Sequence, residues 1–216
     1  MAATRITAVR HGETAWNVDT RIQGQLDIGL NERGLWQAER VGAALAEETI
    51  DCVYSSDLTR AHTTAQAIAR HAHNPHARAV RLHRGLRERG FGSFEGQTWA
   101  DIAEKWPEES RRWRQRDPHF APPGGETPLQ LRERVALTLN EIAQQHLGEH
   151  IVLVAHGGVM DMLYRLATQQ ELHAARTWEL GNAAINRLLW TPDALTLVGW
   201  ADTRHLDDSA LDESTT

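Results

Sequence analysis

The stretch Ile6-Thr7-Ala8-Val9-Arg10-His11-Gly12 decides the fold class of this 216-residue chain. Its first four residues are apolar or β-branched and predict a short buried strand. An arginine, a histidine and a glycine follow that strand at once. A second stretch, residues 151–158, has the same layout: an apolar strand runs into His156-Gly157-Gly158, and a helical pattern comes next.

Working outward from these two stretches, the chain alternates strands and helices. Short apolar, β-branched runs predict strands at 6–9, 52–54, 79–82, 151–155, 185–190 and 195–200. Helical patterns at 31–47, 57–71 and 127–147 open on Asn31, Asp57 and Thr127, which are residue types favoured at a helix start. This alternation predicts a three-layer α/β/α sandwich around a mostly parallel sheet. The turn-like residues 191–194 predict an antiparallel hairpin at one edge.

We expect the whole chain, residues 1–216, to form a single domain, with no internal repeat and no linker. Residues 91–126 interrupt the alternation of strands and helices with tryptophans, arginines, prolines and glycines. We expect them to form short helices and a loop that make up a small cap. Residues 202–216 carry five acidic residues against one arginine, and we expect a frayed, solvated tail.

Composition excludes several function classes. The chain has 29 acidic and 23 basic residues, a net charge of −6, which argues against a nucleic-acid or anionic-membrane partner. Lys105 is the only lysine, so nearly every fixed positive charge is an arginine. The single cysteine, Cys52, rules out an intramolecular disulfide and a cysteine-based zinc site. No leader and no membrane-length apolar run is evident, so we expect a cytoplasmic protein.

The two strand ends predict an anion site. Ligands bind at the carboxyl ends of parallel strands, and a helix that begins at Gly157 would point its free amides at the same place. Arg10 and Arg60 supply guanidinium groups, which bind phosphate oxygens in pairs. A neutral histidine beside them can attack phosphorus and form a phosphohistidine, while a carboxyl group protonates the leaving oxygen. That chemistry needs no metal.

At this point the motifs resemble a known family. Arg10-His11-Gly12-Glu13-Thr14 and the later motifs are similar to the signature of the histidine phosphatase superfamily, in its cofactor-dependent phosphoglycerate mutase-like branch. The resemblance extends from about Ile6 to Trp200 in the expected order. The later motifs are Trp16-Asn17, Arg21-Ile22-Gln23-Gly24, Leu30-Asn31-Glu32-Arg33-Gly34, Ser55-Ser56-Asp57-Leu58-Thr59-Arg60-Ala61, Leu86-Arg87-Glu88-Arg89, Gly124-Gly125-Glu126-Thr127 and His156-Gly157-Gly158.

The resemblance implies a role for each matching residue. His11 would be the nucleophile that becomes phosphorylated. Glu88 would be the general acid that protonates the leaving oxygen and then the base that activates water. The phosphoryl group would be surrounded by Arg10, Arg60, His156 and Gly157, with Asn17, Gln23 and Gly24 from the following loop. By itself, Glu88 could equally be a surface ion-pair partner of the arginines around it, and Glu13 is expected to cap or to form a salt bridge.

Departures from the family pattern favour a phosphatase over a mutase. True mutases have a tyrosine shortly after the acid and a lysine further on, where this chain has Phe91 and Trp99. The span from Glu88 to Glu126 is also shorter than in true mutases. We therefore predict a metal-independent phosphomonoesterase that acts on small phosphorylated metabolites, a histidine acid phosphatase-type hydrolase. Residues 111–116 would either reach a second anionic group or solvate a helix face, and Trp106 and Trp113 would pack the cap onto the sheet.

Three alternatives stay open. A phosphoglycerate mutase would use 2,3-bisphosphoglycerate as its cofactor, whereas the phosphatase needs none. A binding module would hold a phospholigand without turnover. A metal binder is suggested by the 12 histidines, although His71, His73 and His76 have no acidic partner nearby. The expected partner is a small phosphate monoester, and a homodimer is left open.

Overall fold

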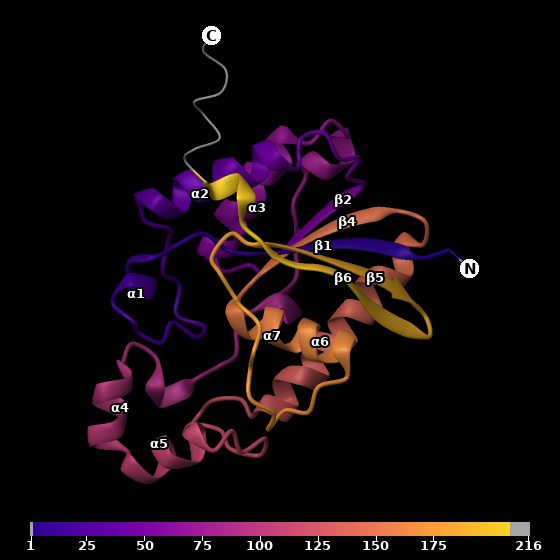
Figure 1. The fold of residues 1–216 in the computed structure, drawn as a ribbon. Coiled ribbons are helices and arrows are strands. Elements are labelled where there is room, and N and C mark those ends of the chain that lie inside the picture. The colour runs from indigo at the N-terminus through magenta and orange to yellow at the C-terminus, as the bar shows by residue number, and fades with distance from the viewer. Residues whose placement is uncertain (1, 208–216) are drawn as a thin grey trace.

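Six strands of the computed structural model, which describes residues 2–207, form one sheet in the order β3-β2-β4-β1-β5-β6 (Figure 1). The pairs β3–β2, β2–β4 and β4–β1 are parallel, and β1–β5 and β5–β6 are antiparallel. The strands are β1 (Thr4–Arg10), β2 (Cys52–Ser55), β3 (Arg81–Leu82), β4 (His150–Ala155), β5 (Ile185–Thr191) and β6 (Ala194–Asp202). The predicted mostly parallel sheet with an antiparallel edge is confirmed.

Helices cover both faces of this sheet (Figure 1). They are α1 (Ala15–Val18), α2 (Glu32–Ala44), α3 (Thr59–His71), α4 (Trp99–Lys105), α5 (Pro107–Arg114), α6 (Pro128–Ala143) and α7 (Gly157–Thr168). Along β4, Val152 and Val154 pack with α2 and α3, while Ile151 and Leu153 pack with α6 and α7. Every residue of β4 is buried, because a central parallel strand lies under helices on both sides. The three-layer prediction is therefore confirmed.

The helix starts agree with the sequence except at α3. Asn31 accepts a hydrogen bond from the Gly34 amide, and Thr127 forms a capping box with Gln130. Asp57 is not the cap of α3. Its carboxylate binds the Arg87 guanidinium at 2.7 Å through both oxygens, and Asp27 accepts the Thr59 amide instead. A bidentate ion pair with a residue distant in sequence outcompetes the local cap.

Two other predicted boundaries are wrong. The strand expected at 79–82 is reduced to Arg81–Leu82, because only these residues pair with β2. The tail expected to fray from Asp202 is ordered as far as Asp207: β6 ends at Asp202 and a short 3-10 helix covers Arg204–Leu206. Arg40 holds this segment by donating to the His205 carbonyl at 2.7 Å. The rest of the predicted tail lies outside the described residues.

Residues 91–126 form short helices and a loop beyond the carboxyl ends of the parallel strands (Figure 1). Phe94 is the centre of a small apolar cluster that also contains Ile22, Ile102 and Phe120. Trp106 and Trp113 pack against Phe94, with ring centroids 5.6 and 6.4 Å away. The two tryptophans therefore pack on other residues of the cap, rather than attaching it to the sheet as the sequence suggested. No helix among residues 2–207 is long and apolar enough to cross a membrane.

Candidate active site

The two matched strand ends meet at one edge of the sheet. Strands β1 and β4 are parallel neighbours whose register places Arg10 beside Ala155, and the His11 amide donates to the Ala155 carbonyl at 3.0 Å. The rings of His11 and His156 are consequently close, with centroids 5.2 Å apart and planes inclined by 60°. Both side chains are buried.

His11 is held as a neutral imidazole. Its Nδ1 lies 2.7 Å from the carbonyl oxygen of Gly12. Because a carbonyl can only accept a hydrogen bond, Nδ1 carries the proton and Nε2 keeps its lone pair. Burial, and then the charges of Arg10 and Arg60, lower the pKa of His11 well below its ordinary value. At neutral pH this side chain can therefore act as a nucleophile through Nε2.

Buried donors without partners gather around this ring. Arg60 is anchored by the carbonyl oxygens of Gly24 and Leu26, at 2.7 and 2.8 Å, and Arg10 by the carbonyl of Leu180. Yet the Nε atoms of both arginines, and both ring nitrogens of His156, have no hydrogen-bond partner in residues 2–207. Buried polar atoms are rarely left unpaired, so this cluster is built to receive an acceptor-rich anion.

His156 belongs to the same electrostatic unit. Burial, followed by the charges of Arg60, His11 and Arg10, lowers its pKa well below the ordinary value. It is also the residue before α7, so the free amides of that helix begin beside it. An anion bound here would meet two guanidinium groups and the positive end of a helix dipole.

Tight glycine packing positions the loop after His11. A Cβ atom on Gly12 would lie 2.4 Å from the carbonyl oxygen of Gly34, and one on Gly34 would lie 2.0 Å from that of Glu13. Both are overlaps with backbone atoms, which cannot move aside, so the loop after β1 can rest on α2 only with glycine at both positions. The Glu13 carboxylate accepts from the Asn31 side chain at 2.9 Å and lies 3.8 Å from the Arg33 guanidinium, so of the two roles expected for it the structure shows the salt bridge.

The three loop residues named from the sequence lie near this cluster in different settings. Asn17 closes a capping box with Thr14, through its side-chain oxygen. Gln23 is buried, and its Oε1 is unpaired in the described chain. Gly24 adopts a φ of +53°, which suits glycine, and its carbonyl orients Arg60.

Glu88 reaches the site from the loop after β3. Its carboxylate accepts the Arg89 amide at 2.7 Å and the Gly158 amide at 3.1 and 3.0 Å, one distance for each oxygen. Its negative charge opposes the lowering of the pKa values of both Arg10 and Arg60 by burial. A Cβ on Gly158 would lie 2.3 Å from Glu88 Oε1, so only glycine at this position leaves room for the carboxylate.

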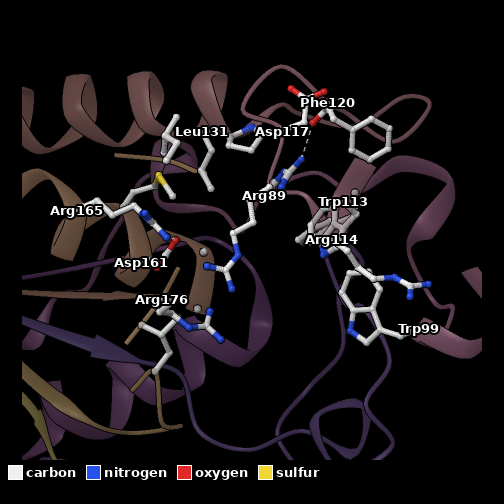
Figure 2. A pocket seen from close by; sticks show the side chains of 18 of the residues that line it. Arg89, Trp99, Trp113, Arg114, Asp117, Phe120, Leu131, Asp161, Arg165 and Arg176 are labelled. Atoms are coloured by element: carbon white, nitrogen blue, oxygen red, sulfur yellow. Dashed lines mark hydrogen bonds and ion pairs between the residues drawn. The ribbon is translucent and has the colours of Figure 1, made fainter. Parts of the chain in front are cut away.

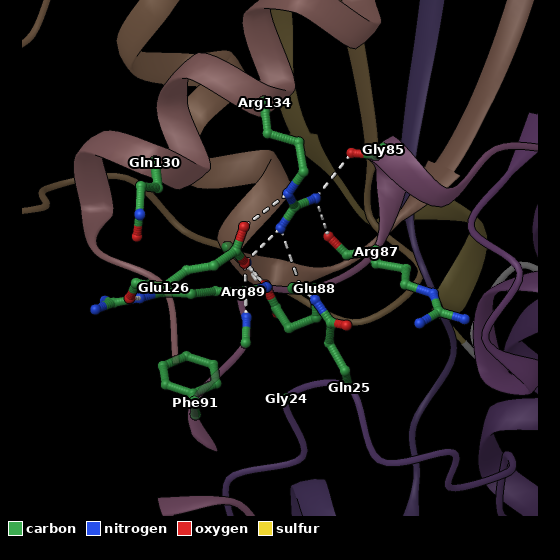
Figure 3. Close-up of polar contacts among 12 residues, drawn as sticks. Gly24, Gln25, Gly85, Arg87, Glu88, Arg89, Phe91, Glu126, Gln130 and Arg134 are labelled. Atoms are coloured by element: carbon green, nitrogen blue, oxygen red, sulfur yellow. Dashed lines mark hydrogen bonds and ion pairs between the residues drawn. The ribbon is translucent and has the colours of Figure 1, made fainter. Parts of the chain in front are cut away.

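The Glu88 loop is braced by an ion pair that the sequence did not single out (Figure 3). Arg134 of α6 binds both carboxylate oxygens of Glu126, at 2.8 and 2.7 Å. It also donates to the backbone carbonyls of Gly85 and Arg87 at 2.9 Å, and to that of Glu88 at 3.3 Å. Burial opposes ionisation of Glu126, but the hydrogen bonds from Arg134 and the Gly90 amide outweigh it and lower the pKa of Glu126. The motif Gly124-Gly125-Glu126-Thr127 was the one available signal.

Asn182 is a second residue missed by the sequence analysis. Its side-chain amide donates to the carbonyl oxygens of His11 and Gly12, at 3.0 and 3.3 Å. Next to it, the Ala183 amide donates to the Arg10 carbonyl at 3.0 Å. The segment before β5 therefore holds the loop that carries His11 in place through backbone contacts. A lone Asn 170 residues away from the loop carries no local signal of this contact.

A cavity of about 750 Å³ lies between α7 and the cap (Figure 2). Its lining includes Arg10, Gly157 and Gly158, which adjoin His11 and His156 in the chain, but neither histidine itself. The cap contributes Phe91, Trp99, Trp113, Arg114, Arg116, Asp117 and Phe120. The arginines of residues 111–116 do not share one environment. Arg114 and Arg116 line the cavity, whereas Arg111 pairs with Glu108 on the surface and Arg112 pairs with Asp117. In residues 2–207, no three His, Cys, Asp or Glu side chains are placed to hold a metal ion.

Comparison with known proteins agrees with this site. The chain is 40% identical over 205 residues, 94% of its length and 83% of the other chain, to a metal-independent phosphoserine phosphatase of Arabidopsis thaliana. It is 32% identical over 218 residues, 97% of this chain and 98% of the relative, to a probable phosphoglycerate mutase of Escherichia fergusonii. A solved structure of phosphoserine phosphatase from Entamoeba histolytica, in complex with phosphoserine, superposes with a TM-score of 0.83 at 28% identity, covering 94% of this chain and 100% of that one.

The expected family and the expected enzyme class, a phosphoric monoester hydrolase, are confirmed by these relatives. The family model for branch 1 matches residues 6–203, nearly the whole described chain. The chain belongs to the histidine phosphatase superfamily, branch 1.

Proposed function

We propose that this protein hydrolyses phosphate monoesters of small metabolites through a phosphohistidine intermediate on His11, without a metal ion. One observation carries the proposal: a buried, neutral His11 with a free Nε2 lies among cationic and polar nitrogens that have no partner in the described chain. The metal-independent relative from Arabidopsis supports the absence of a metal requirement.

In the first step, the phosphoryl oxygens bind the unpaired nitrogens of Arg10, Arg60 and His156. The lone pair of His11 Nε2 forms a bond to phosphorus while the bond from phosphorus to the ester oxygen breaks. Glu88 gives its proton to that oxygen, so the product leaves as a neutral alcohol. The fixed arginine charges balance the phosphoryl oxygens, which is the task a metal ion performs in other phosphatases.

In the second step, water attacks phosphorus and the bond to Nε2 breaks. Glu88, now a carboxylate, accepts a proton from the water, and inorganic phosphate leaves. The hydrogen bond from His11 Nδ1 to the Gly12 carbonyl persists through both steps and keeps the ring in one orientation.

Two side chains support water, rather than a second metabolite, as the phosphoryl acceptor. Phe91 and Trp99 line the cavity where the family resemblance places a tyrosine and a lysine in true mutases. Neither side chain carries a charge that would hold a phosphorylated intermediate during its reorientation. We therefore propose a phosphatase and keep the mutase as the alternative to be tested.

The test is to trap the intermediate. The enzyme is mixed with a ³²P-labelled phosphate monoester, quenched and assayed for a protein-bound label that is stable to base and labile to acid. We expect that label, activity that persists in EDTA, and loss of both label and activity in His11→Asn. With 3-phosphoglycerate and 2,3-bisphosphoglycerate we expect phosphate and no 2-phosphoglycerate. Activity that is lost in EDTA, or that survives His11→Asn, contradicts the proposal.

A further inference from the structure

Asn182 contacts two parts of the phosphoryl site at once. It lies in the segment between α7 and β5, and its side-chain Nδ2 is within hydrogen-bond distance of three oxygens. These are the carbonyl oxygens of His11 and Gly12, at 3.0 and 3.3 Å, and Oδ1 of Asn17, at 3.3 Å. Because a carbonyl oxygen can only accept, the nitrogen end of the Asn182 amide must face this loop. No other side chain in residues 2–207 bonds both to the backbone of His11 or Gly12 and to Asn17.

The backbone of Gly12 is held from both sides. Its amide donates to the Thr64 hydroxyl at 3.1 Å. Its carbonyl oxygen accepts from His11 Nδ1 at 2.7 Å and from Asn182 at 3.3 Å, one donor for each lone pair. Glycine has the widest choice of backbone torsions, so this carbonyl keeps its direction through its contacts rather than through the chain itself. That direction decides the tautomer of His11, since Nδ1 keeps its proton only while the carbonyl faces the ring.

Asn17 is held by the same contact. Its Oδ1 accepts from the amide and the hydroxyl of Thr14, each at 3.0 Å, in addition to Asn182. An amide N–H can only donate, so this end of the Asn17 side chain is the oxygen. Its Nδ2 has no partner in the described chain and remains a donor, which suits a phosphoryl oxygen. Thr14 fixes which end of Asn17 is free, and Asn182 fixes where that end lies relative to His11.

We propose that Asn182 is a positioning residue of phosphoryl transfer. It keeps the Gly12 carbonyl on the His11 ring, so that Nε2 stays free to attack, and it holds the Asn17 donor at a fixed distance from that nitrogen. This inference rests on the proposed function and adds a residue that makes no contact with the reacting atoms. Its two parts predict different losses, one in the rate of attack and one in the binding of the phosphoryl group.

The first experiment follows His11. Asn182→Ala removes all three contacts, and Asn182→Ser keeps a shorter donor. Long-range ¹H–¹⁵N NMR spectra of the imidazole should show the proton on Nδ1 in the wild type, and shared between both nitrogens in Asn182→Ala. With p-nitrophenyl phosphate, whose leaving group needs no proton from Glu88, the rate of phosphoenzyme formation should fall roughly 100-fold in Asn182→Ala and less in Asn182→Ser.

Asn186 supplies the matched control. It is buried in the adjoining strand β5, and its own Nδ2 donates to the carbonyl of Ala8 at 3.1 Å, outside the site. Asn186→Ala should therefore lower the melting temperature at least as much as Asn182→Ala does. It should nevertheless keep the wild-type tautomer of His11, and the rate of phosphoenzyme formation should stay within a few-fold of the wild-type rate.

The second experiment follows Asn17. Inorganic phosphate is the probe, and its Kd is measured by calorimetry in the wild type, Asn17→Ala, Asn182→Ala and the double variant. Asn182→Ala should raise the Kd roughly 10-fold, as expected for a misplaced hydrogen bond to a charged group. The same change should cost clearly less when Asn17 is already alanine, because residues that act through one another have non-additive effects.

The outcomes separate this inference from the function on which it rests. If Asn182→Ala melts earlier than the wild type but keeps its tautomer, rate and phosphate Kd, Asn182 serves stability alone and the inference is refuted, while the phosphatase stands. An undiminished loss of phosphate affinity in the Asn17→Ala background also contradicts it. If the wild-type protein forms no phosphoenzyme, the proposed function fails and the positioning role fails with it. Should Asn182→Ala not fold, Asn182→Ser takes its place in the same comparisons.

Discussion

Gly158→Ala isolates the role of Glu88 without touching its carboxylate. The new Cβ would be 2.3 Å from Glu88 Oε1, whereas real Cβ atoms almost never come closer than 3.0 Å to a neighbouring heavy atom. Since Oε1 is the end of a flexible side chain, the carboxylate will swing away rather than the helix moving. It then loses the Gly158 amide, which binds both of its oxygens.

The expected loss falls on catalysis and not on stability. General acid catalysis contributes about 10²- to 10⁴-fold, and a misplacement of about 1 Å costs on the order of 10²-fold. We therefore expect kcat/KM for an alkyl phosphate such as phosphoserine to fall roughly 100-fold. Alanine in place of glycine favours a helix by up to about 1 kcal/mol, which offsets the lost hydrogen bonds, so the free energy of unfolding should change by less than about 1 kcal/mol.

A glycine outside the site is the matched control. A Cβ on Gly29 would meet no atom within 4 Å, so Gly29→Ala should keep kcat/KM within a few-fold. The assay compares phosphoserine with p-nitrophenyl phosphate, whose phenolate leaves without a proton. Gly158→Ala should lose much less of its rate on the aryl ester. Equal losses on both esters, or equal losses in the two alanine variants, would refute the assignment of Glu88 as the acid.

Three further predictions follow from the same contacts. Since the pKa values of His11 and His156 are lowered well below 6.5, the unfolded chain binds more protons below that pH, and the free energy of unfolding should fall on acidification. Below pH 6.5, each histidine should lower the free energy of unfolding by up to about 1.4 kcal/mol for every unit that the pH falls, and above pH 6.5 it should have no effect. In denaturant titrations at several pH values, the free energy of unfolding of His156→Asn should therefore fall less steeply with pH than that of the wild type, by the contribution of one histidine. Arg134→Met leaves Glu126 without its partner, so it should lower the free energy of unfolding by about 3 kcal/mol and also lower kcat for alkyl phosphates. Arg132→Met on the same helix should change neither quantity. Inorganic phosphate at 100 times its Kd should raise the free energy of unfolding by about 2.7 kcal/mol, seen as a rise in Tm, and Arg10→Met should reduce this rise.

The clustering of His11 and His156 could be predicted from the sequence because the motifs that carry them are local. Arg10-His11-Gly12 and His156-Gly157 each follow an apolar strand directly, and the parallel direction of both strands brings their ends to one edge. What the sequence did not contain is that β1 and β4 are neighbours in register, which the structure supplies through Arg10 and Ala155. Residue type and strand end were enough to predict the site, but not its internal distances.

Predictions from the sequence were wrong where a partner distant in the chain outweighed a local preference. Asp57 has the residue type and position of an α3 cap, yet Arg87 takes both of its oxygens. Ala183 adopts a φ of +58°, a left-handed conformation that no rule for alanine would predict, and its amide supports the His11 loop. Such contacts depend on chain segments that meet only after folding, so hydrophobic periodicity and residue propensities cannot predict them.

The same distinction separates the proposed reaction centre from the rest of the cavity. The charges assigned to phosphoryl transfer, Arg10 and Arg60, lie at the end of β1 and in the first turn of α3, where short motifs reveal them. The polarity of the cavity wall is set differently. Asp161 has an unpaired oxygen there only because Arg165 binds the other one, and no local pattern predicts which oxygen stays free. For this reason the reaction class could be predicted from the sequence, whereas the polar groups of the cavity wall are visible only in the structure.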